Sequence, residues 1–152
     1  MVKLEEAIKS TKFKNEVQKA GLNVLYTAWW LKTMSSKELK KFDLTHEQYN
    51  VLRILKGMHP IKMCVKDIAS RMIEKNSNVP RIIDRLEKKK WIKRAQGEVD
   101  GRQTVMALTE SGIRVLEQAT ISLNTILSEN ITLSETDATA LNILLEKIRI
   151  KE

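Results

Sequence analysis

Residues 63–109, MCVKDIASRMIEKNSNVPRIIDRLEKKKWIKRAQGEVDGRQTVMALT, contain the pattern that decides the fold. In the middle of this stretch, apolar residues recur at i, i+3, i+4 and i+7, while polar and cationic residues recur at a similar period on another face. The apolar set is Val79, Ile82, Ile83 and Leu86, and the polar set is Asn78, Arg81, Arg85 and Lys88. The spacing predicts a helix with one side in a core and the other free to meet a polyanion. Long cations alone are equally typical of a solvated face, so the surrounding sequence has to decide.

The flanking residues predict a helix-turn-helix followed by a β-ribbon. A helical stripe runs from about Val65 to Glu74, a turn follows at 75–76, Ser77 is the predicted cap, and Pro80 falls in the first turn of the next helix. Residues 91–94 and 104–108 have strand composition, and residues 96–103 form a hairpin loop between them. This order predicts a winged helix over residues 43–109.

The composition is that of a basic globular protein. At 152 residues the chain is large enough for one domain with a real core. The net charge of +8 favours nucleic acid or an anionic surface as the partner. The absence of a long apolar run or signal-like start favours a soluble, cytoplasmic protein with no membrane contact. A single cysteine and two histidines give no metal site, and no cofactor is expected.

Helices are predicted on both sides of the winged helix, which makes the fold class mainly α. One long helix, whose apolar stripe begins at Val17, spans about Lys14–Lys41. A capping box at Thr45–Gln48 starts another helix, and a short strand is expected at residues 61–63. Thr109 and Ser134 are caps of two C-terminal helices, the second with a stripe that includes Leu141, Leu144 and Ile148. Their apolar stripes exceed what a small winged helix can cover. We therefore expect residues 1–42 and 110–152 to be dimerisation helices, with packing of three helices within one chain as the alternative.

Two local features leave alternatives open. The indoles of Trp29 and Trp30 point about 100° apart on a helix, so either both are core residues or one meets a partner chain or a ligand. Cys64 stands where a helix cap is usual, which allows redox sensing, although a lone cysteine without a basic neighbour is more often inert. His46 and His59 are interpreted as surface or boundary residues.

Several motifs in their order resemble the MarR family of bacterial transcription regulators. They are Leu44-Thr45-His46-Glu47-Gln48-Tyr49, the run from Val65 to Met72, the run from Asn78 to Glu87, Asp100-Gly101-Arg102 and the run from Ala107 to Gly112. The resemblance covers roughly residues 45–112. It implies a homodimer on a pseudo-palindromic operator in double-stranded DNA, with the second helix in the major groove and the wing in the minor groove.

The resemblance also implies roles for individual residues. Asn78 and Arg81 would read base edges, Ser77 and Arg85 would contact phosphates, and Arg102 would enter the minor groove. Asp100 would hold Arg102 or Arg94 in place. Independently of the resemblance, Lys88 on the polar face of the predicted helix is expected to make a contact that does not depend on the DNA sequence. The chemistry of these side chains agrees, since arginine pairs with guanine, asparagine pairs with adenine, and a cation suits a narrow A·T-rich minor groove.

The sequence departs from the family pattern at two positions. Lys90 stands where glycine usually ends the recognition helix, and a non-glycine residue in a left-handed cap costs on the order of 1 kcal/mol. Gly101 stands where a second wing arginine is common, so one phosphate contact is expected to be missing.

The favoured function is therefore a transcriptional regulator, most simply a repressor, released by a small phenolic or aromatic effector. The family's ligand site makes Tyr26, Trp29, Trp30 and Tyr49 candidates for binding it, although packing explains each of them equally well. The alternative is a winged helix that binds protein and has no specific operator. An enzymatic activity is not expected, because the sequence offers no phosphate-binding glycine loop, metal cluster or activated nucleophile.

Overall fold

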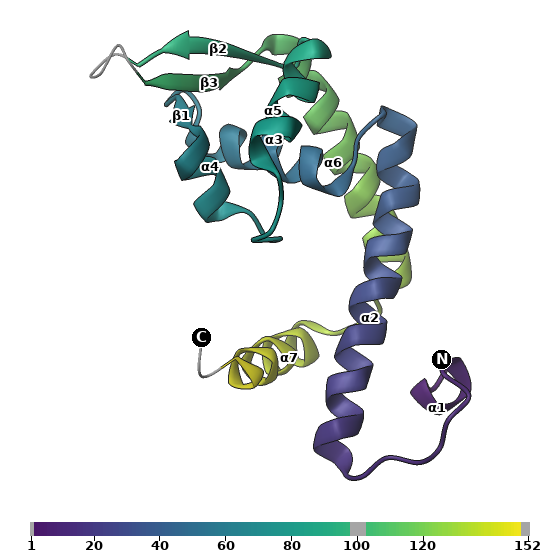
Figure 1. Cartoon of the computed structure of the whole chain (residues 1–152). Helices are drawn as coiled ribbons and strands as arrows, with labels where there is room; N and C mark the ends of the chain where they lie inside the picture. The colour runs from purple at the N-terminus through teal and green to yellow at the C-terminus, as the bar shows by residue number, and fades with distance from the viewer. Residues whose placement is uncertain (1, 98–102, 150–152) are drawn as a thin grey trace.

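The computed structural model describes residues 2–97 and 103–149, and the order of its helices and strands is that of a winged helix with further helices on both sides (Figure 1). In chain order they are α1 (Leu4–Ala7), α2 (Glu16–Leu39), the short 3-10 helix η1 (Lys40–Phe42), α3 (His46–Met58), β1 (Met63–Cys64), α4 (Val65–Arg71), α5 (Val79–Lys88), β2 (Ile92–Gln96), β3 (Thr104–Leu108), α6 (Glu110–Asn130) and α7 (Glu135–Ile148). The predicted fold class, mainly α with a small β-wing, is confirmed.

The three strands form one antiparallel sheet in the order β1-β3-β2. Met63 pairs with Met106, and the longer ladder between β2 and β3 runs from Ile92 opposite Leu108 to Gln96 opposite Thr104. The core lies where this sheet meets α3, α4 and α5, and the side chains in it are almost completely buried. They include Leu52, Ile68, Met72, Ile83, Leu86, Ile92 and Met106.

The predicted capping signals start helices where expected. The Thr45 hydroxyl accepts from the Gln48 amide while the Gln48 side chain accepts from the Thr45 amide, which completes the capping box. Thr109 and Ser134 likewise accept from amides three residues later. These side chains satisfy amides that have no partner within the helix, so each helix begins at a defined residue.

Several predicted boundaries shift. The expected helix from Lys14 begins at Glu16, because the Asn15 side chain caps it by accepting from the Gln18 amide at 2.9 Å. Ahead of it lies α1, which the sequence analysis did not predict. The helix expected to reach Glu74 ends at Arg71, and the strand expected at residues 61–63 lies at Met63–Cys64.

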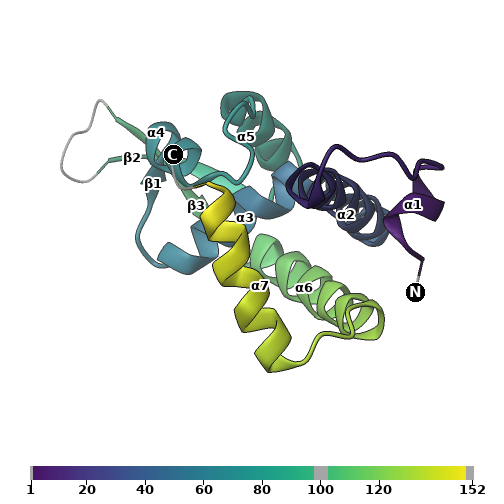
Figure 2. The same ribbon diagram turned by 90° about the horizontal axis from the view of Figure 1, so that it is seen from below.

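Helices α2 and α6 lie side by side and join the winged helix to the termini (Figure 2). The Glu38 carboxylate is buried between them, pairs with Lys41 at 2.8 Å and accepts a hydrogen bond from the Ser122 hydroxyl. Lys41 first, and Ser122 second, hold the pKa of Glu38 below its usual value.

The outer parts of these helices leave large apolar side chains uncovered. No residue of α7 is buried, and its predicted stripe includes Leu141, Leu144 and Ile148, all of them exposed. On α2, Val17 is 81% exposed although the sequence analysis assigned it to an inward stripe. The alternative in which the terminal helices pack within one chain therefore does not account for α7. No helix in the described residues is both long and apolar enough to cross a bilayer.

Candidate nucleic-acid interface

Helix α5 presents the two faces that its sequence predicts. Val79, Ile83 and Leu86 are buried in the core and Ile82 is partly buried against it. The polar face is open to solvent along the length of the helix, and its residues are Asn78, Arg81, Arg85 and Lys88. Arg81, Arg85 and Lys88 form no ion pair with any of the described residues, so their charges are available to an external polyanion.

The start of α5 lies one residue later than expected. Asn78, not Ser77, is the N-cap, and its side-chain oxygen accepts from the Arg81 amide at 3.1 Å. The Ser77 hydroxyl is buried and has no hydrogen-bond partner in the described residues. The predicted cap at Ser77 is therefore wrong, because the asparagine carboxamide reaches the free amide from the next position. A phosphate contact by Ser77 would first require its side chain to rotate outward.

The end of α5 confirms the predicted departure at Lys90. This residue has φ 60°, in the left-handed region, and its amide donates to the Glu87 carbonyl at 2.8 Å. The Trp91 amide donates to the Leu86 carbonyl at 3.1 Å, which completes a Schellman motif. The helix thus ends sharply at a position where glycine would be less strained.

Arg94, on β2, is held against α5. Its guanidinium donates to the carboxylates of Asp84 and Glu87. Asp84 first, and then Glu87, raise the pKa of Arg94 above its usual value. Asp100 is predicted to hold Arg102 or Arg94, and within the described residues Arg94 is held by two carboxylates on α5. Asp100 and Arg102 themselves lie outside the described residues, as does Gly101.

A cavity of about 240 Å³ lies between α2, α3, α6 and the segment that follows α4. Tyr49 lines it, together with Arg53, Met72, Leu123 and Leu127. The Tyr49 hydroxyl hydrogen-bonds to the Thr120 hydroxyl at 3.0 Å, and Arg53 lies 5.9 Å from its ring centroid. Tyr49 is therefore both a packing residue and part of the cavity wall.

The other three aromatic candidates are on α2 and do not line this cavity. Tyr26 and Trp29 contact each other with their ring centroids 5.5 Å apart, and Trp29 is 57% exposed while Trp30 is partly buried. The interpretation in which both tryptophans are core residues is therefore wrong for the single chain. The cavity is lined by one of the four predicted ligand residues, Tyr49, and the other three lie on α2 outside it.

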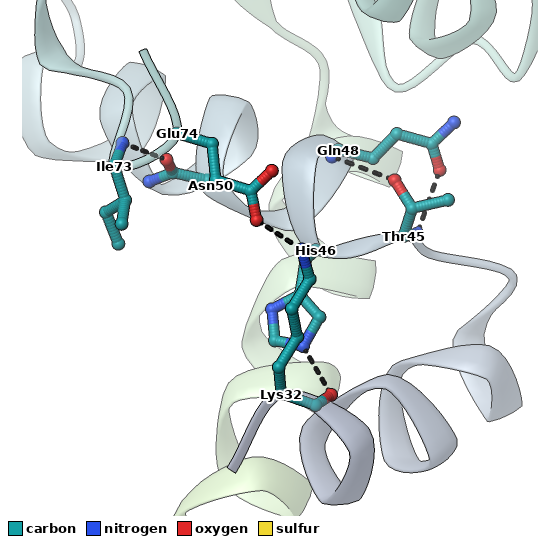
Figure 3. A network of polar contacts seen from close by, with 7 residues as sticks. All are labelled: Lys32, Thr45, His46, Gln48, Asn50, Ile73 and Glu74. Atoms are coloured by element: carbon teal, nitrogen blue, oxygen red, sulfur yellow. Dashed lines mark hydrogen bonds and ion pairs between the residues drawn. The ribbon is translucent and has the colours of Figure 1, made fainter. Parts of the chain in front are cut away.

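A polar network joins α2 and α3 to the segment that follows α4 (Figure 3). Lys32 on α2 forms an ion pair with Glu74, and its carbonyl contacts the His46 ring at 3.0 Å. The Asn50 side chain accepts from the Ile73 amide at 3.0 Å. These contacts hold the segment between α4 and α5 against α2 and α3. Sequence periodicity could not have found them, because each joins residues far apart in the chain.

Cys64 and the histidines form no reactive or metal-binding cluster. The Cys64 thiol is buried and donates to the Asp67 carboxylate at 3.1 Å, so the side chain it contacts is an anion and not the lysine, arginine or histidine typical of reactive cysteines. Within the described ranges, no group of three or more histidine, cysteine, aspartate and glutamate side chains could hold a metal ion. The exposed face of α5 is thus the strongest candidate site.

The sequence matches known DNA-binding regulators. A model of the MarR family matches residues 44–104. YfiV of Bacillus subtilis, an HTH-type transcriptional regulator, is 37% identical over 78 residues, which are 51% of this chain and about half (48%) of YfiV. MgrA of Staphylococcus aureus, also an HTH-type transcriptional regulator, is 30% identical over 114 residues, which are 75% of this chain and 76% of MgrA.

Solved structures share the fold over most of the chain. CouR of Rhodococcus jostii RHA1, solved with p-coumaroyl-CoA bound, has a TM-score of 0.78 at 18% identity and covers 92% of this chain and 98% of its own. A mutant of MepR from S. aureus bound to an oligodeoxyribonucleotide has a TM-score of 0.59 at 25% identity, covering 85% and 94%. With the winged helix matched by the family model and most of MgrA covered at 30% identity, the chain belongs to the MarR family of DNA-binding transcriptional regulators.

Proposed function

We propose that the protein is a homodimeric repressor that binds a pseudo-palindromic operator and is released by a small aromatic ligand. The observation that carries the proposal is the solvent-exposed polar face of α5, with Asn78 and Arg81 at its N-terminal end. The N-terminal residues of a recognition helix are the ones that reach base edges in the major groove. Arg81 would pair with guanine, while Asn78 would donate from its amide nitrogen because its oxygen already caps the helix.

The remaining contacts of the proposed DNA-binding region, residues 43–109, would be made with the backbone and the minor groove. Arg85 and Lys88 continue the exposed stripe of α5 and would contact phosphates. The ladder of β2 and β3 leads to the wing, where Arg102 would enter the minor groove. An Arg102→Ala variant should then lose affinity for duplexes with A·T-rich flanks and keep its affinity for G·C-rich ones. Equal losses on both flanks would remove the wing from the minor groove.

The uncovered apolar surface supports a dimer made by residues 1–42 and 110–152. Helix α7 has exposed Ile143, Leu144 and Ile148 and no buried residue, and a short helix of this kind is stable only when its apolar face is covered. A second copy of the chain supplies the same surface, and a two-fold axis between the copies would match an inverted repeat in the operator.

The cavity lined by Tyr49 supports regulation by a ligand. It is large enough for one substituted aromatic ring, and the segment from Ile73 to Glu74 that walls it leads directly to the cap of α5. A ligand that binds more tightly to the conformation with a displaced segment would shift the recognition helix away from its DNA-binding position. CouR, which has a similar fold, was solved with p-coumaroyl-CoA, and because the p-coumaroyl group carries a phenol ring, phenolic acids are the first compounds to test.

Selection from random duplexes tests the proposal. Purified protein should enrich an inverted repeat, and its elution in size-exclusion chromatography should correspond to a dimer. Addition of phenolic acids to the selected complex should then weaken binding. A protein that enriches no sequence above background would instead be a winged helix that binds protein, and the operator proposal would be refuted.

A further inference from the structure

A second hollow beside α5 gathers cations from parts of the chain that are distant in sequence. It has a volume of about 670 Å³ and lies between the C-terminal end of α2 with η1, the first turn of α3 and the C-terminal half of α5. We call it the α2–α5 hollow. Its charged lining consists of Lys32, Lys40, Arg85, Lys88 and Lys89, opposed by Asp43 and Glu47.

Part of this charge is neutralised within the chain. Lys89 pairs with Asp43, with 3.0 Å between Nζ and Oδ2, and also donates to the Asp43 carbonyl. Lys32 pairs with Glu74, which lies outside the hollow. Three cations remain, Lys40, Arg85 and Lys88, and none of them forms an ion pair or a side-chain hydrogen bond with any residue that the structure describes. Against them stands Glu47, so the hollow keeps a positive excess.

The position of Lys40 makes it different from the other unpaired cations. Arg85 and Lys88 belong to the exposed stripe of α5, whereas Lys40 opens η1 at the end of α2. The α2–α5 hollow therefore continues the cationic surface of the recognition helix onto the helix that enters from the N-terminal region. A concave surface lined by one sign of charge focuses the potential and attracts the opposite charge.

The openness of the hollow favours a long polyanion over a small anion. Lys40, Arg85 and Lys88 are all exposed, and no buried cation lies at the base of the hollow to desolvate and hold a single phosphate. Exposed cations bind weakly one at a time, but a row of them on a nucleic-acid backbone gains free energy by releasing condensed counterions. No internal ion pair has to break for any of the three to make such a contact.

We propose that the α2–α5 hollow binds the sugar–phosphate backbone of the duplex whose major groove receives α5, with Lys40 contacting a phosphate beside that groove. The inference rests on the proposed operator binding. It adds to that function a backbone contact from outside the winged helix, and it assigns Lys40 a role that neither helical periodicity nor the family motifs indicate.

The salt dependence of binding tests this contact. We would measure the affinity of the wild type, Lys40→Gln, Lys40→Arg and Lys37→Gln for a fluorescent duplex over a series of salt concentrations. Lys37 is the matched control, because it is exposed on the last turn of α2 but does not line the hollow. Lys40→Gln should reduce the slope of log K against log salt by about 0.9 for each protomer on the duplex, or about 1.8 for a dimer, while Lys40→Arg and Lys37→Gln should keep the wild-type slope.

A neutral methylphosphonate placed at single backbone positions locates the partner phosphate. One substitution should weaken wild-type binding and have no further effect on Lys40→Gln, because both changes remove the same contact. An unchanged slope for Lys40→Gln, or equal losses for Lys40→Gln and Lys37→Gln, would overturn the proposal. The measurements use both the selected operator and a mixed-sequence duplex, so failure of operator selection would refute the regulator while the slope still decides the role of the hollow.

Discussion

Replacement of Lys90 by glycine should stabilise the protein, although it removes a side chain. Lys90 has φ 60°, and a side chain with a Cβ in this left-handed region costs roughly 1–2 kcal/mol. Glycine removes that cost but adds about 0.4–1 kcal/mol of conformational entropy to the unfolded chain. The expected net gain is about 0.5–1 kcal/mol, or a rise in melting temperature of about 1–4 °C for a chain of this length.

The surroundings of Lys90 should not add other contributions to this change in stability. Its side chain is exposed and forms no ion pair with any residue that the structure describes. The Lys90 amide donates to Glu87, and the Lys90 carbonyl accepts from the hydroxyls of Thr109 and Ser111 at 2.8 and 2.9 Å. Glycine can form all of these backbone bonds, so only the strain and the entropy change.

Two control variants isolate the cause. Lys90→Ala removes the side chain beyond Cβ but keeps the strain, and it should leave stability nearly unchanged. Lys88→Gly places glycine in the last helical turn, where it should cost up to about 1 kcal/mol. Urea unfolding at one fixed protein concentration measures all three, since the stability of a dimer depends on concentration. If Lys90→Gly were no more stable than Lys90→Ala, the left-handed strain would be refuted.

Three further changes test packing, base reading and acid sensitivity. Gly112→Ala should cost about 1–3 kcal/mol in urea unfolding, because a Cβ there would lie 2.0 Å from the Trp91 carbonyl oxygen; wild-type stability would contradict the close approach. Arg81→Ala should lose about 1–3 kcal/mol of binding free energy and relax the preference at one base pair, whereas Lys88→Ala should reduce the affinity for all duplexes by the same factor. Competition assays measure both effects. The reverse result would mean that α5 docks on the DNA in another register. The pKa of Glu38 in the folded protein is lowered from 4.5, so its carboxylate stabilises the fold above that value, and this stabilisation is lost as the pH falls through the lower folded pKa. Glu38→Gln should therefore make the free energy of unfolding depend less on pH on the acid side. An unchanged pH dependence would show that this carboxylate does not contribute to the acid sensitivity.

The sequence alone predicts the elements whose signals are local. The two faces of α5, the caps at Thr45, Thr109 and Ser134, and the strained end at Lys90 all depend on side chains within a few positions of one another. Periodicity and capping chemistry act over that range, so they identify the winged helix without knowledge of the tertiary structure.

Errors occurred where two local solutions were close in energy or where the outcome depended on tertiary contacts. Ser77 and Asn78 are both good caps, and their order in the chain does not decide between them; in the structure the Asn78 oxygen takes the Arg81 amide and the Ser77 hydroxyl is buried. The pairing of Arg94 with Asp84 and Glu87 joins β2 to α5 and has no local sequence signal, whereas the predicted role of Asp100 toward Arg102 or Arg94 lies outside the described residues. Val17 has helical spacing and yet is exposed, because periodicity indicates a face and not what covers it.

The sequence does not indicate the α2–α5 hollow, because the residues that line it belong to different predicted helices and share no motif. Lys40 follows a helix assigned to dimerisation, and Arg85 lies in the recognition helix, so no motif contains both. Both line the hollow because Lys89, near the end of α5, forms an ion pair with Asp43. The Nζ atom of Lys89 also lies 4.7 Å from the centroid of the Trp91 ring. The ion pair fixes the end of α2 beside α5, and it uses the acidic residue that would otherwise oppose the free cations. The positive excess of the hollow is therefore a consequence of tertiary pairing, and it can be tested only at the level of the folded protein.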